Sequence, residues 1–324
     1  MTSRALIVTA HGDRSVLAVE SRPLPEPRSG EVLVAVEAVG VNFIDVYFRT
    51  GAYPGQTPFV LGSEGAGVIA AVGGVTDVQV GDRVAWAMVR GTGASHAIVP
   101  ADLLVPVPDP VSSEDAAAVM LQGMTAHYLA TDTYPIGPGD VALVHAAAGG
   151  VGQLLTPLIV ARGGRVVATA GTDDKCEIAR ARGAYRSINY RDVDDLVGAV
   201  REATEDRGVD VVYDGVGAAT FDASLAALRP RGTLVLYGAA SGPVPPFDLQ
   251  RLNSGGSLFV TRPSLAHYML TRDELIRRGT EVLGSVADGS LTVSIGGRWP
   301  LGDAAEAYAA LESRASTGKL LLIP

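Results

Sequence analysis

The chain has 324 residues, of which 47% are hydrophobic and 19% are charged, and its formal net charge is −9 at pH 7. This length allows two domains, and the acidic balance argues against a general attraction to nucleic acid. The N-terminus reaches charged residues too early for a signal peptide, and no uncharged apolar run reaches the roughly 18 residues of a membrane span. The single cysteine, Cys176, excludes an intramolecular disulfide and a multi-cysteine metal cluster. We expect a soluble cytoplasmic protein with no nucleic-acid or membrane partner.

Short runs of apolar and β-branched residues, separated by glycine- and proline-containing turns, fill the first part of the chain. They span residues 4–10, 15–20, 31–41, 65–73, 82–88 and 94–100. Short strands at this spacing predict a barrel-like or partly open β domain.

The pattern changes near residue 112, where a helix is predicted over 112–130 and strands then alternate with helices. Strands are predicted over 141–147, 165–170, 209–216 and 232–240, and helices over 149–163, 173–184, 192–205 and 221–230. This alternation is typical of a parallel sheet covered by helices. The tail has predicted helices over 273–289 and 303–313 and a closing strand over 319–324, and we expect it to pack back on the first domain.

A glycine-rich turn joins the first of these strands to its helix and reads Ala147-Ala148-Gly149-Gly150-Val151-Gly152. It fits the G-x-G-x-x-G pattern of dinucleotide-binding turns, with alanine in the first glycine place. Gly149 would let the backbone approach a pyrophosphate, and Gly152 would let the helix pack close to the strand. The alanine is expected to change the turn slightly. The turn predicts a nicotinamide dinucleotide site at the helix N-terminus.

The second strand of the alternating region decides which nicotinamide coenzyme is favoured. NAD sites carry an acidic residue about 20 residues beyond the glycines, and residues 166–172 contain none. Lys175 and Tyr190 could instead bind the 2′-phosphate of NADPH. Asp173 or Asp174 could be the missing acid if the strand runs longer, whereas a strand that ends at Gly171 makes them helix-capping residues. The pattern favours NADPH.

A bound metal is not expected. The segment Gly62–Gly67 has the glycine frame of the His-Glu motif of zinc alcohol dehydrogenases, but Ser63 takes the histidine place. Asn42 or Asp45 lies where a cysteine ligand would be expected, and serine and asparagine are poor zinc ligands. His96, His127 and His145 are scattered along the chain and are interpreted as hydrogen-bonding side chains.

Together these segments resemble the NADPH:quinone oxidoreductases, the zeta-crystallin-like branch of the medium-chain dehydrogenase/reductases. The most specific matching stretches are Val41–Tyr47, Leu121–Ala126, His145–Gly152, Ile188–Arg191, Val260–Leu265 and Glu312–Arg314. The resemblance runs nearly from end to end. It implies an α/β fold, with a GroES-like β-rich catalytic domain over 1–123 and 267–324 and a Rossmann, doubly wound parallel-sheet domain over 124–266. It also implies a homodimer and a coenzyme in the cleft between the domains.

The resemblance further implies which residues contact the coenzyme. At its nicotinamide end these are Asn42, Phe43, Asp45, Tyr47, Gln122 and Thr125. At the pyrophosphate and the adenosine they are Ala148, Gly149, Gly150, Val151, Gly152, Gly171, Thr172, Lys175 and Tyr190. Gly215, Tyr237, Arg262 and Arg314 complete the set. Gln122 stands where some relatives carry lysine and Gly215 where some carry serine, so the fine contacts differ.

A quinone is the expected acceptor, because it has a conjugated electrophilic carbonyl system to which the coenzyme can deliver hydride. Tyr47 and Tyr53 could hydrogen-bond the reduced oxygen or stack on the acceptor ring, although Tyr53 could equally anchor its loop. Asp45 is a candidate for proton transfer or for binding a backbone amide, and Asn42 for a functional role or a turn. Cys176 is interpreted as packing. Reduction of an enone or enoyl-thioester double bond is an alternative activity, and a non-catalytic NADPH-binding protein is another alternative.

A late apolar stretch bears on assembly. Residues 256–261 are predicted to form a last strand at the edge of the parallel sheet. Exposed edge strands tend to pair, so this stretch predicts the same dimer as the resemblance.

Overall fold

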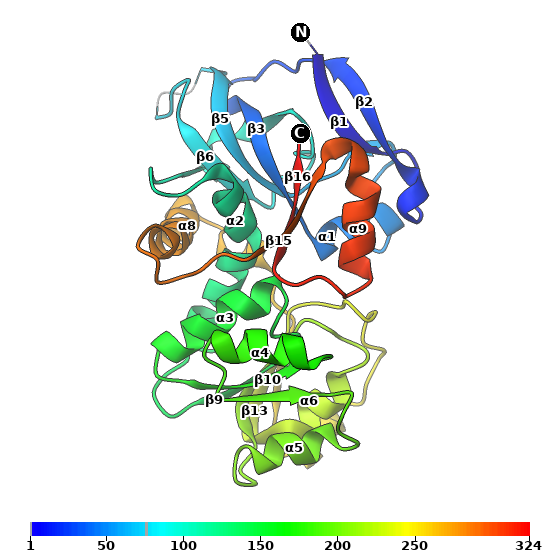
Figure 1. Ribbon diagram of the computed structural model, residues 1–324, viewed down its shortest axis with the longest axis vertical. Coiled ribbons are helices and arrows are strands. Elements are labelled where there is room, and N and C mark those ends of the chain that lie inside the picture. The colour runs from blue at the N-terminus through cyan, green and yellow to red at the C-terminus, as the bar shows by residue number, and fades with distance from the viewer. Residues whose placement is uncertain (1, 75–76) are drawn as a thin grey trace. The chain divides into compact units, whose positions relative to one another are not determined.

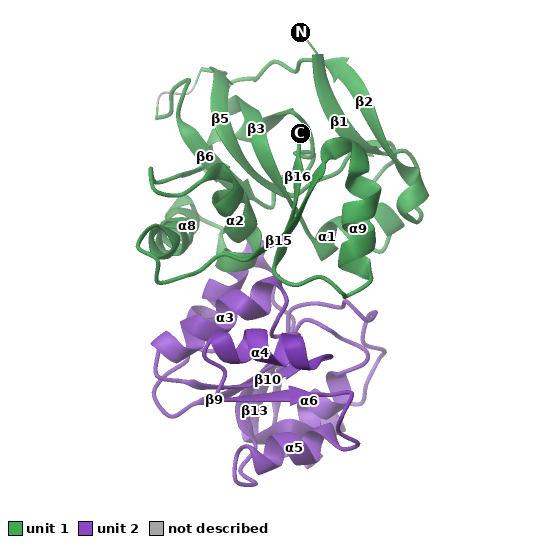
Figure 2. Ribbon diagram, in the orientation of Figure 1, with its two compact units in different colours: residues 1–124, 268–324 green, residues 125–267 purple. Residues whose placement is uncertain are grey.

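The computed structural model covers residues 1–324 and describes all of them except 1, 75 and 76. The chain forms two compact units (Figure 2). Unit 1 comprises residues 1–124 and 268–324, and unit 2 comprises residues 125–267. In the described part of the chain, no helix is both long and apolar enough to cross a membrane.

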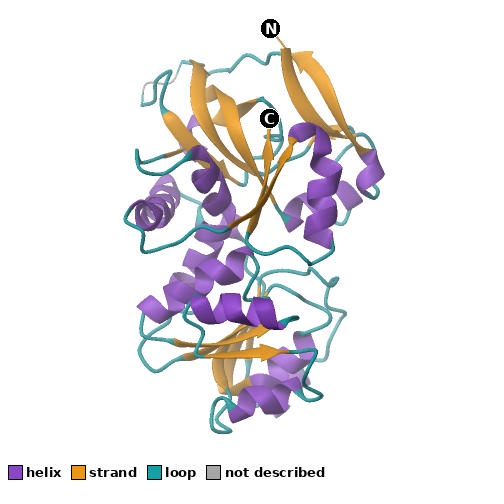
Figure 3. Cartoon of the chain, viewed as in Figure 1, coloured by secondary structure: helices purple, strands orange, loops and turns teal. Residues whose placement is uncertain are grey.

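Unit 1 is built on two sheets (Figures 1 and 3). The smaller sheet has the order β2-β1-β4, and the larger has the order β15-β16-β3-β5-β6-β8, with β7 paired to β3. The strands are β1 (Thr2–Val8), β2 (Leu17–Pro23), β3 (Glu31–Val41), β4 (Phe59–Val60), β5 (Glu64–Val72), β6 (Arg83–Ala87), β7 (His96–Pro100), β8 (Val105–Pro106), β15 (Ile295–Pro300) and β16 (Lys319–Ile323). The last strand pairs antiparallel with β3, with Leu321 opposite Gly40, so the end of the chain lies beside the end of β3.

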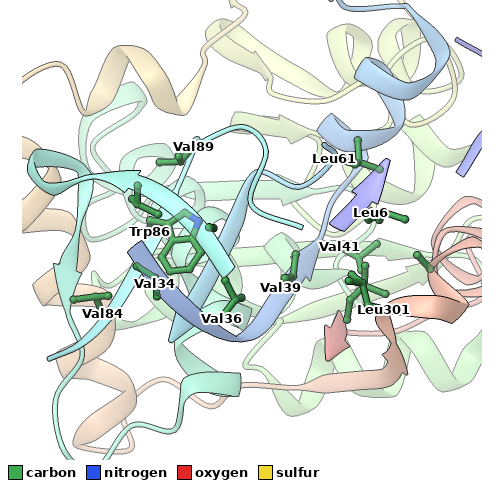
Figure 4. Packing of buried hydrophobic residues seen from close by; sticks show 14 of the residues in the cluster. Leu6, Val34, Val36, Val39, Val41, Leu61, Val84, Trp86, Val89 and Leu301 are labelled. Carbon is green, nitrogen blue, oxygen red and sulfur yellow. The ribbon is translucent and has the colours of Figure 1, made fainter. Parts of the chain in front are cut away.

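The core of unit 1 lies where alternating residues of these strands turn inward. Trp86 of β6 belongs to the same core cluster as Val34 and Val36 of β3 (Figure 4). Val34 and Trp86 are completely buried. The strands predicted over the first hundred residues are therefore confirmed, and their apolar faces form the core.

Four helices accompany these sheets in the described part of unit 1. They are α1 (Phe43–Thr50), α2 (Ser113–Tyr128, whose last four residues belong to unit 2), α8 (Arg272–Ala287) and α9 (Ala304–Glu312). The sequence did not predict α1, because its aromatic and β-branched residues are weak helix formers. Its ends compensate for this composition. The backbone N–H of Asn42 donates to the Asp45 carboxylate at 3.1 Å, and Gly51 ends the helix at a left-handed φ of 80°.

Unit 2 has one parallel sheet with the order β11-β10-β9-β12-β13-β14. Its strands are β9 (Val141–Val144), β10 (Arg165–Ala170), β11 (Arg186–Asn189), β12 (Val209–Asp214), β13 (Leu228–Leu236) and β14 (Phe259–Thr261). Its helices are α3 (Gly150–Ala161), α4 (Asp173–Ala181), α5 (Leu196–Glu202), α6 (Phe221–Ala227) and α7 (Gln250–Ser254). Every residue of β9 and β12 is buried, as expected for the centre of a parallel sheet.

Two boundaries in unit 2 differ from the prediction. The helix predicted to reach residue 230 ends at Ala227, because Pro230 disfavours helical backbone at the residue before it and Leu228 already pairs with Val209. The helix predicted from residue 192 begins at Leu196, where the Asp195 carboxylate accepts from the N–H of Gly198 at 2.9 Å.

Candidate functional site

Most of the coenzyme contacts predicted for unit 2 follow the carboxyl ends of its parallel strands. The glycine turn follows β9, Gly171 and Thr172 follow β10, Tyr190 follows β11, Gly215 follows β12, Tyr237 follows β13, and Arg262 follows β14. The order of the strands reverses direction between β9 and β12. In sheets of this type, ligands bind outside the carboxyl ends of the strands at such a reversal. Thr125, on α2, is the one predicted unit 2 contact away from this edge.

The turn after β9 fits a pyrophosphate. Ala146 takes a left-handed φ of 50°, and this unusual conformation falls one residue before the alanine in the first glycine place. A Cβ added to Gly152 would lie 2.6 Å from the Cα of Ala147, so only glycine lets α3 pack this closely on the turn. Gly149 precedes α3 without a side-chain cap, so the first N–H groups of the helix are available to an anion.

The segment after β10 carries a convergence of cationic and phenolic groups. A Cβ added to Gly171 would lie 2.5 Å from the Tyr190 hydroxyl and 3.5 Å from Nε of Arg191. Burial lowers the pKa of the Lys175 ammonium, and the positive charge of Arg191 lowers it further. Lys175, Tyr190 and Arg191 therefore gather around the end of β10, where their charges and hydroxyl suit a phosphate.

Asp173 and Asp174 do not extend β10. That strand ends at Ala170, and Thr172 caps α4 by accepting from the N–H of Lys175 at 3.3 Å. Both aspartates lie in the first turn of α4, and Asp173 accepts from the side chain of Asn189 at 3.1 Å. They belong to the helix start, although the capping residue itself is Thr172.

A buried hydrogen-bonded chain lies at the ends of β9 and β12. The Asp214 carboxylate accepts from the Ser224 hydroxyl at 2.8 Å, so Oγ of Ser224 accepts from Nε2 of His145 at 3.1 Å. Nδ1 of His145 is then left to accept from the Thr169 hydroxyl at 2.8 Å. Burial lowers the pKa of His145, and Asp214 partly offsets this. His145 is therefore a neutral hydrogen-bonding residue that ties together the strands next to the glycine turn.

Asp214 also fixes the segment that follows β12. Its other carboxylate oxygen accepts from the N–H groups of Val216 and Gly217 at 2.8 and 3.0 Å. A Cβ added to Gly215 would lie 2.8 Å from Cζ of Tyr237, so the tyrosine ring lies directly against the Gly215 backbone. The predicted contacts Gly215 and Tyr237 are thus brought together.

In unit 1, Asn42 belongs to a buried polar cluster with Glu64 and Lys319. Its amide donates to Glu64 at 2.8 Å and to the carbonyl of Gly40 at 3.2 Å, and its Oδ1 accepts from Nζ of Lys319 at 2.8 Å. Lys319 also forms a salt bridge to Glu64, which accepts from the N–H of Leu121 at 2.5 Å. Glu64 is fully buried and Lys319 is 2% exposed. A Cβ on Gly40 would lie 2.1 Å from the Glu64 carboxylate, so this cluster requires glycine there.

Asp45 forms a second group next to this cluster. Its carboxylate accepts from the hydroxyl of Ser63 at 2.8 Å and from the hydroxyl of Tyr308 at 3.1 Å, besides the N–H of Asn42. Burial raises the pKa of Asp45 to about 6, while the hydrogen bonds and the charge of Lys319 oppose this rise. Asp45 can therefore change its protonation state near neutral pH, and it also anchors α1.

Aromatic side chains from α1 and the following loop form a third group, the aromatic cluster of Phe43, Tyr47, Phe48 and Tyr53. The Tyr47 and Tyr53 rings lie 5.1 Å apart, and Phe48 meets Tyr53 edge to face at 5.5 Å. Phe43 lies 6.4 Å from Tyr47. All four rings are partly exposed, so they offer a surface on which a flat ligand can stack.

Sequence reasoning missed several members of these groups. Lys319 and Tyr308 were not predicted as site residues, because they are distant in sequence and only the pairing of β16 with β3 and the packing of α9 bring them to Asn42 and Asp45. Glu64 was not predicted either, and it reaches Asn42 because β5 pairs with β3. Gln122 lies on α2, and its side-chain oxygen is buried with no hydrogen-bond partner among the described residues. Arg314 follows α9 and has a left-handed φ of 58°.

The described residues contain no group of three or more histidine, cysteine, aspartate or glutamate side chains placed to hold a metal ion. Cys176 is buried on α4, and burial raises the pKa of its thiol.

Comparison with known proteins identifies the family. Residues 28–109 match the model for the alcohol dehydrogenase GroES-like domain, and residues 150–279 match the model for zinc-binding dehydrogenases. The quinone oxidoreductase of Salmonella typhimurium is 43% identical over 97% of this chain and 97% of its own length. The 2-haloacrylate reductase of a Burkholderia species is 39% identical over 99% of this chain and 98% of its own.

A mycobacterial protein, solved as a complex with NADPH, superposes with a TM-score of 0.96 at 48% identity, covering 99% of this chain and 100% of its own. The expected fold class, a GroES-like domain with a Rossmann domain, is confirmed. The chain therefore belongs to the quinone oxidoreductase family of the medium-chain dehydrogenase/reductases.

Proposed function

We propose that this protein is an NADPH-dependent quinone oxidoreductase. The reaction takes a hydride from NADPH and a proton from solvent or protein, and it gives NADP⁺ and a hydroquinone. The observation that carries the proposal is the row of predicted coenzyme contacts at one edge of the unit 2 sheet, with Lys175, Tyr190 and Arg191 at the end of β10. The names of the relatives and the NADPH complex of the mycobacterial protein support the same activity.

NADPH, when bound, supplies the hydride, and the residues of unit 2 fit its parts. The bare N-terminus of α3 suits the pyrophosphate, and the close approach of Gly152 makes room for it. Lys175, Tyr190 and Arg191 would hold the 2′-phosphate, which NADH lacks. In unit 1, the side-chain oxygen of Gln122 is buried with no hydrogen-bond partner among the described residues, and it would accept from the carboxamide of the nicotinamide. Thr125, Arg262 and Arg314 stay predicted contacts.

The aromatic cluster of unit 1 is proposed to bind the acceptor. Tyr47 and Tyr53 are partly exposed, and tyrosine side chains can stack on a quinone and hydrogen-bond its oxygen. Asn42 and Asp45 use their polar atoms on buried partners, and we assign them a positioning role for α1 and its aromatic side chains.

We further propose that the reaction needs no zinc. The ammonium of Lys319 hydrogen-bonds to Asn42 and Glu64, so a cation is already built into this cluster. Ser63 hydrogen-bonds to Asp45, and neither serine nor asparagine is a good zinc ligand. Activity is expected to survive exhaustive chelation in protein that contains no stoichiometric zinc. Elemental analysis that finds about one zinc per chain, lost together with activity, contradicts this part of the proposal.

A homodimer is proposed on the basis of the edge strand β14. This strand pairs only with β13 among the described strands, and Phe259 on it is 61% exposed. An unpaired edge with an exposed aromatic side chain is suited to pair with a second copy of the chain. Light scattering is expected to give about twice the chain mass of 33.4 kDa, and Phe259→Lys is expected to shift the protein toward monomer. A monomeric wild type rejects this assembly.

Reduction of a conjugated double bond is the second candidate, because a 2-haloacrylate reductase is among the relatives. The purified protein should be screened for NADPH oxidation with a para-quinone, an ortho-quinone, an enone, an enoyl-CoA and 2-chloroacrylate. Quinone-dependent oxidation is expected to be fastest. Faster oxidation with 2-chloroacrylate or the enone assigns the alternative activity, and NADPH binding without any turnover assigns the non-catalytic role.

A further inference from the structure

Arg90 lies on a turn that is fixed rigidly to the segment preceding Ser63. This turn, residues 88–93, lies in the segment 88–95 that joins β6 to β7. The N–H of Gly91 donates to the carbonyl of Gly62 at 2.9 Å, and the N–H of Gly93 donates to the carbonyl of Leu61 at 2.7 Å. A Cβ on Gly62 would lie 2.4 Å from the backbone nitrogen of Gly93, so the two segments are in direct backbone contact. The backbone position of Arg90 is thus fixed beside the polar groups of unit 1.

The Arg90 side chain stacks on the aromatic cluster. Its guanidinium carbon lies 4.2 Å from the centre of the Phe48 ring and 5.6 Å from that of Phe59. Phe48 in turn meets Tyr53 edge to face at 5.5 Å. One terminal nitrogen of Arg90 would be 3.1 Å from a Cβ on Gly55, so the side chain also lies against the loop that carries Tyr53. Arg90 therefore belongs to the same surface as the tyrosines proposed to bind the acceptor.

The hydrogen-bond donors of Arg90 are left available by this arrangement. A guanidinium held against an aromatic ring by a cation–π contact keeps N–H donors for other partners. Arg90 is exposed, and among the residues that the structure describes it forms no hydrogen bond and no ion pair. The chain as a whole carries a net charge of −9, so the protein's overall charge does not attract anions to this surface. A guanidinium fixed in this way is suited to bind a carboxylate or sulfonate with two parallel hydrogen bonds.

We infer that Arg90 is a specificity residue that pairs with an anionic substituent on the conjugated acceptor. The preferred substrates are then quinones, or other conjugated carbonyl compounds, that carry a carboxylate or sulfonate next to the ring or double bond. This inference rests on the proposed function, since it extends the acceptor surface formed by Tyr47 and Tyr53.

The test compares two acceptors that differ by one charged group, 1,4-naphthoquinone and 1,4-naphthoquinone-2-sulfonate, at saturating NADPH. The measured quantity is the ratio of kcat/KM for the sulfonate to kcat/KM for the neutral quinone. Arg90→Gln is expected to lower this ratio about tenfold, which corresponds to about 1.4 kcal/mol. Arg90→Lys keeps the charge but loses the planar pair of donors, so it is expected to recover only part of the ratio. Raised ionic strength should lower the ratio in the wild type more than in Arg90→Gln.

Arg28→Gln is the matched control, because Arg28 is also an exposed arginine of unit 1, lies outside the aromatic cluster, and gives the same change in net charge. The control is expected to keep the wild-type ratio. An unchanged ratio in Arg90→Gln, or an equal fall in Arg28→Gln, overturns the assignment of Arg90. If Arg90→Lys keeps the full wild-type ratio, the charge alone is sufficient, and the claim that Arg90 binds the anion through two parallel hydrogen bonds is rejected.

Binding of 2-naphthoate, measured by calorimetry against 2-naphthamide, separates this inference from the proposed function. If no quinone is reduced, the proposed function fails. The wild type is still expected to bind 2-naphthoate about tenfold more tightly than Arg90→Gln does. If quinones are reduced but naphthoate and naphthamide bind both proteins equally, the proposed function stands and the role of Arg90 is rejected.

Discussion

Replacing Lys319 by methionine tests whether the buried cluster of unit 1 depends on its built-in cation. The change keeps an unbranched side chain that is one atom shorter, and it removes the ammonium that hydrogen-bonds to Asn42 and Glu64. Glu64, which is fully buried, then has no positive partner in this cluster. It still accepts from the Asn42 amide and from the N–H of Leu121.

The expected cost follows from this burial. Removing one partner of a buried ion pair costs about 3–5 kcal/mol, and the two remaining hydrogen bonds place Lys319→Met near the lower end. A domain has only about 5–15 kcal/mol of stability, so the loss is large. The variant is therefore expected to unfold at a clearly lower urea concentration than the wild type.

Urea denaturation of the wild type and the variant at neutral pH measures the effect, provided that the slopes agree. The double variant Lys319→Met, Glu64→Gln removes both charges, and it should be more stable than Lys319→Met alone. A loss below about 1 kcal/mol refutes the reasoning, because Glu64 would then be solvated or paired in another way.

Three further outcomes are expected. Lys175→Ala and Arg191→Ala should each weaken NADPH binding about tenfold and leave NADH binding almost unchanged, as measured by calorimetry, and equal losses for both coenzymes contradict the 2′-phosphate assignment. Tyr53→Phe should lower kcat/KM for a para-quinone by up to about 100-fold without changing NADPH affinity, whereas Tyr47→Ala should lower kcat/KM and NADPH affinity. Full turnover in the two variants would mean that these tyrosines have only a structural role. Asp45 has a folded pKa of about 6, above its usual value of 3.8, so the stability that it contributes at low pH is lost as pH rises through 6. The urea midpoint of Asp45→Asn should therefore rise relative to that of the wild type between about pH 4 and 7. A difference between the two midpoints that does not change with pH argues against this pKa.

Most of the parallel sheet and its glycine turn could be predicted from sequence, because most of the strands are short apolar runs and several of the helices have a recognisable start. β11 was missed, since its four residues, Arg186–Asn189, show no apolar run and become a strand only by pairing with β10. Arg191 was missed as a site residue for a related reason. Its proximity to Lys175 arises from that same pairing and not from spacing along the chain.

The polar cluster of unit 1 could be predicted only in part. Asn42 and Asp45 stand out because they lie together in one matching segment, whereas Lys319 lies 277 residues from Asn42 and is brought to it by a strand at the end of the chain. A lysine in an apolar closing strand is the signal that was available, since a buried lysine needs a partner. The helix α1 depends on its end residues more than on its composition, so patterns of apolar residues did not reveal it.

The relative efficiency of NADPH and NADH in quinone reduction tests the central claim most directly. Initial rates of coenzyme oxidation with 1,4-benzoquinone should be measured over a range of each coenzyme in the same protein preparation. The groups around the end of β10 predict quinone-dependent oxidation with kcat/KM for NADPH about tenfold or more above that for NADH, a difference of about 1.4 kcal/mol. Oxidation that does not depend on quinone, or a preference for NADH, would contradict the assignment of this protein as an NADPH-dependent quinone oxidoreductase.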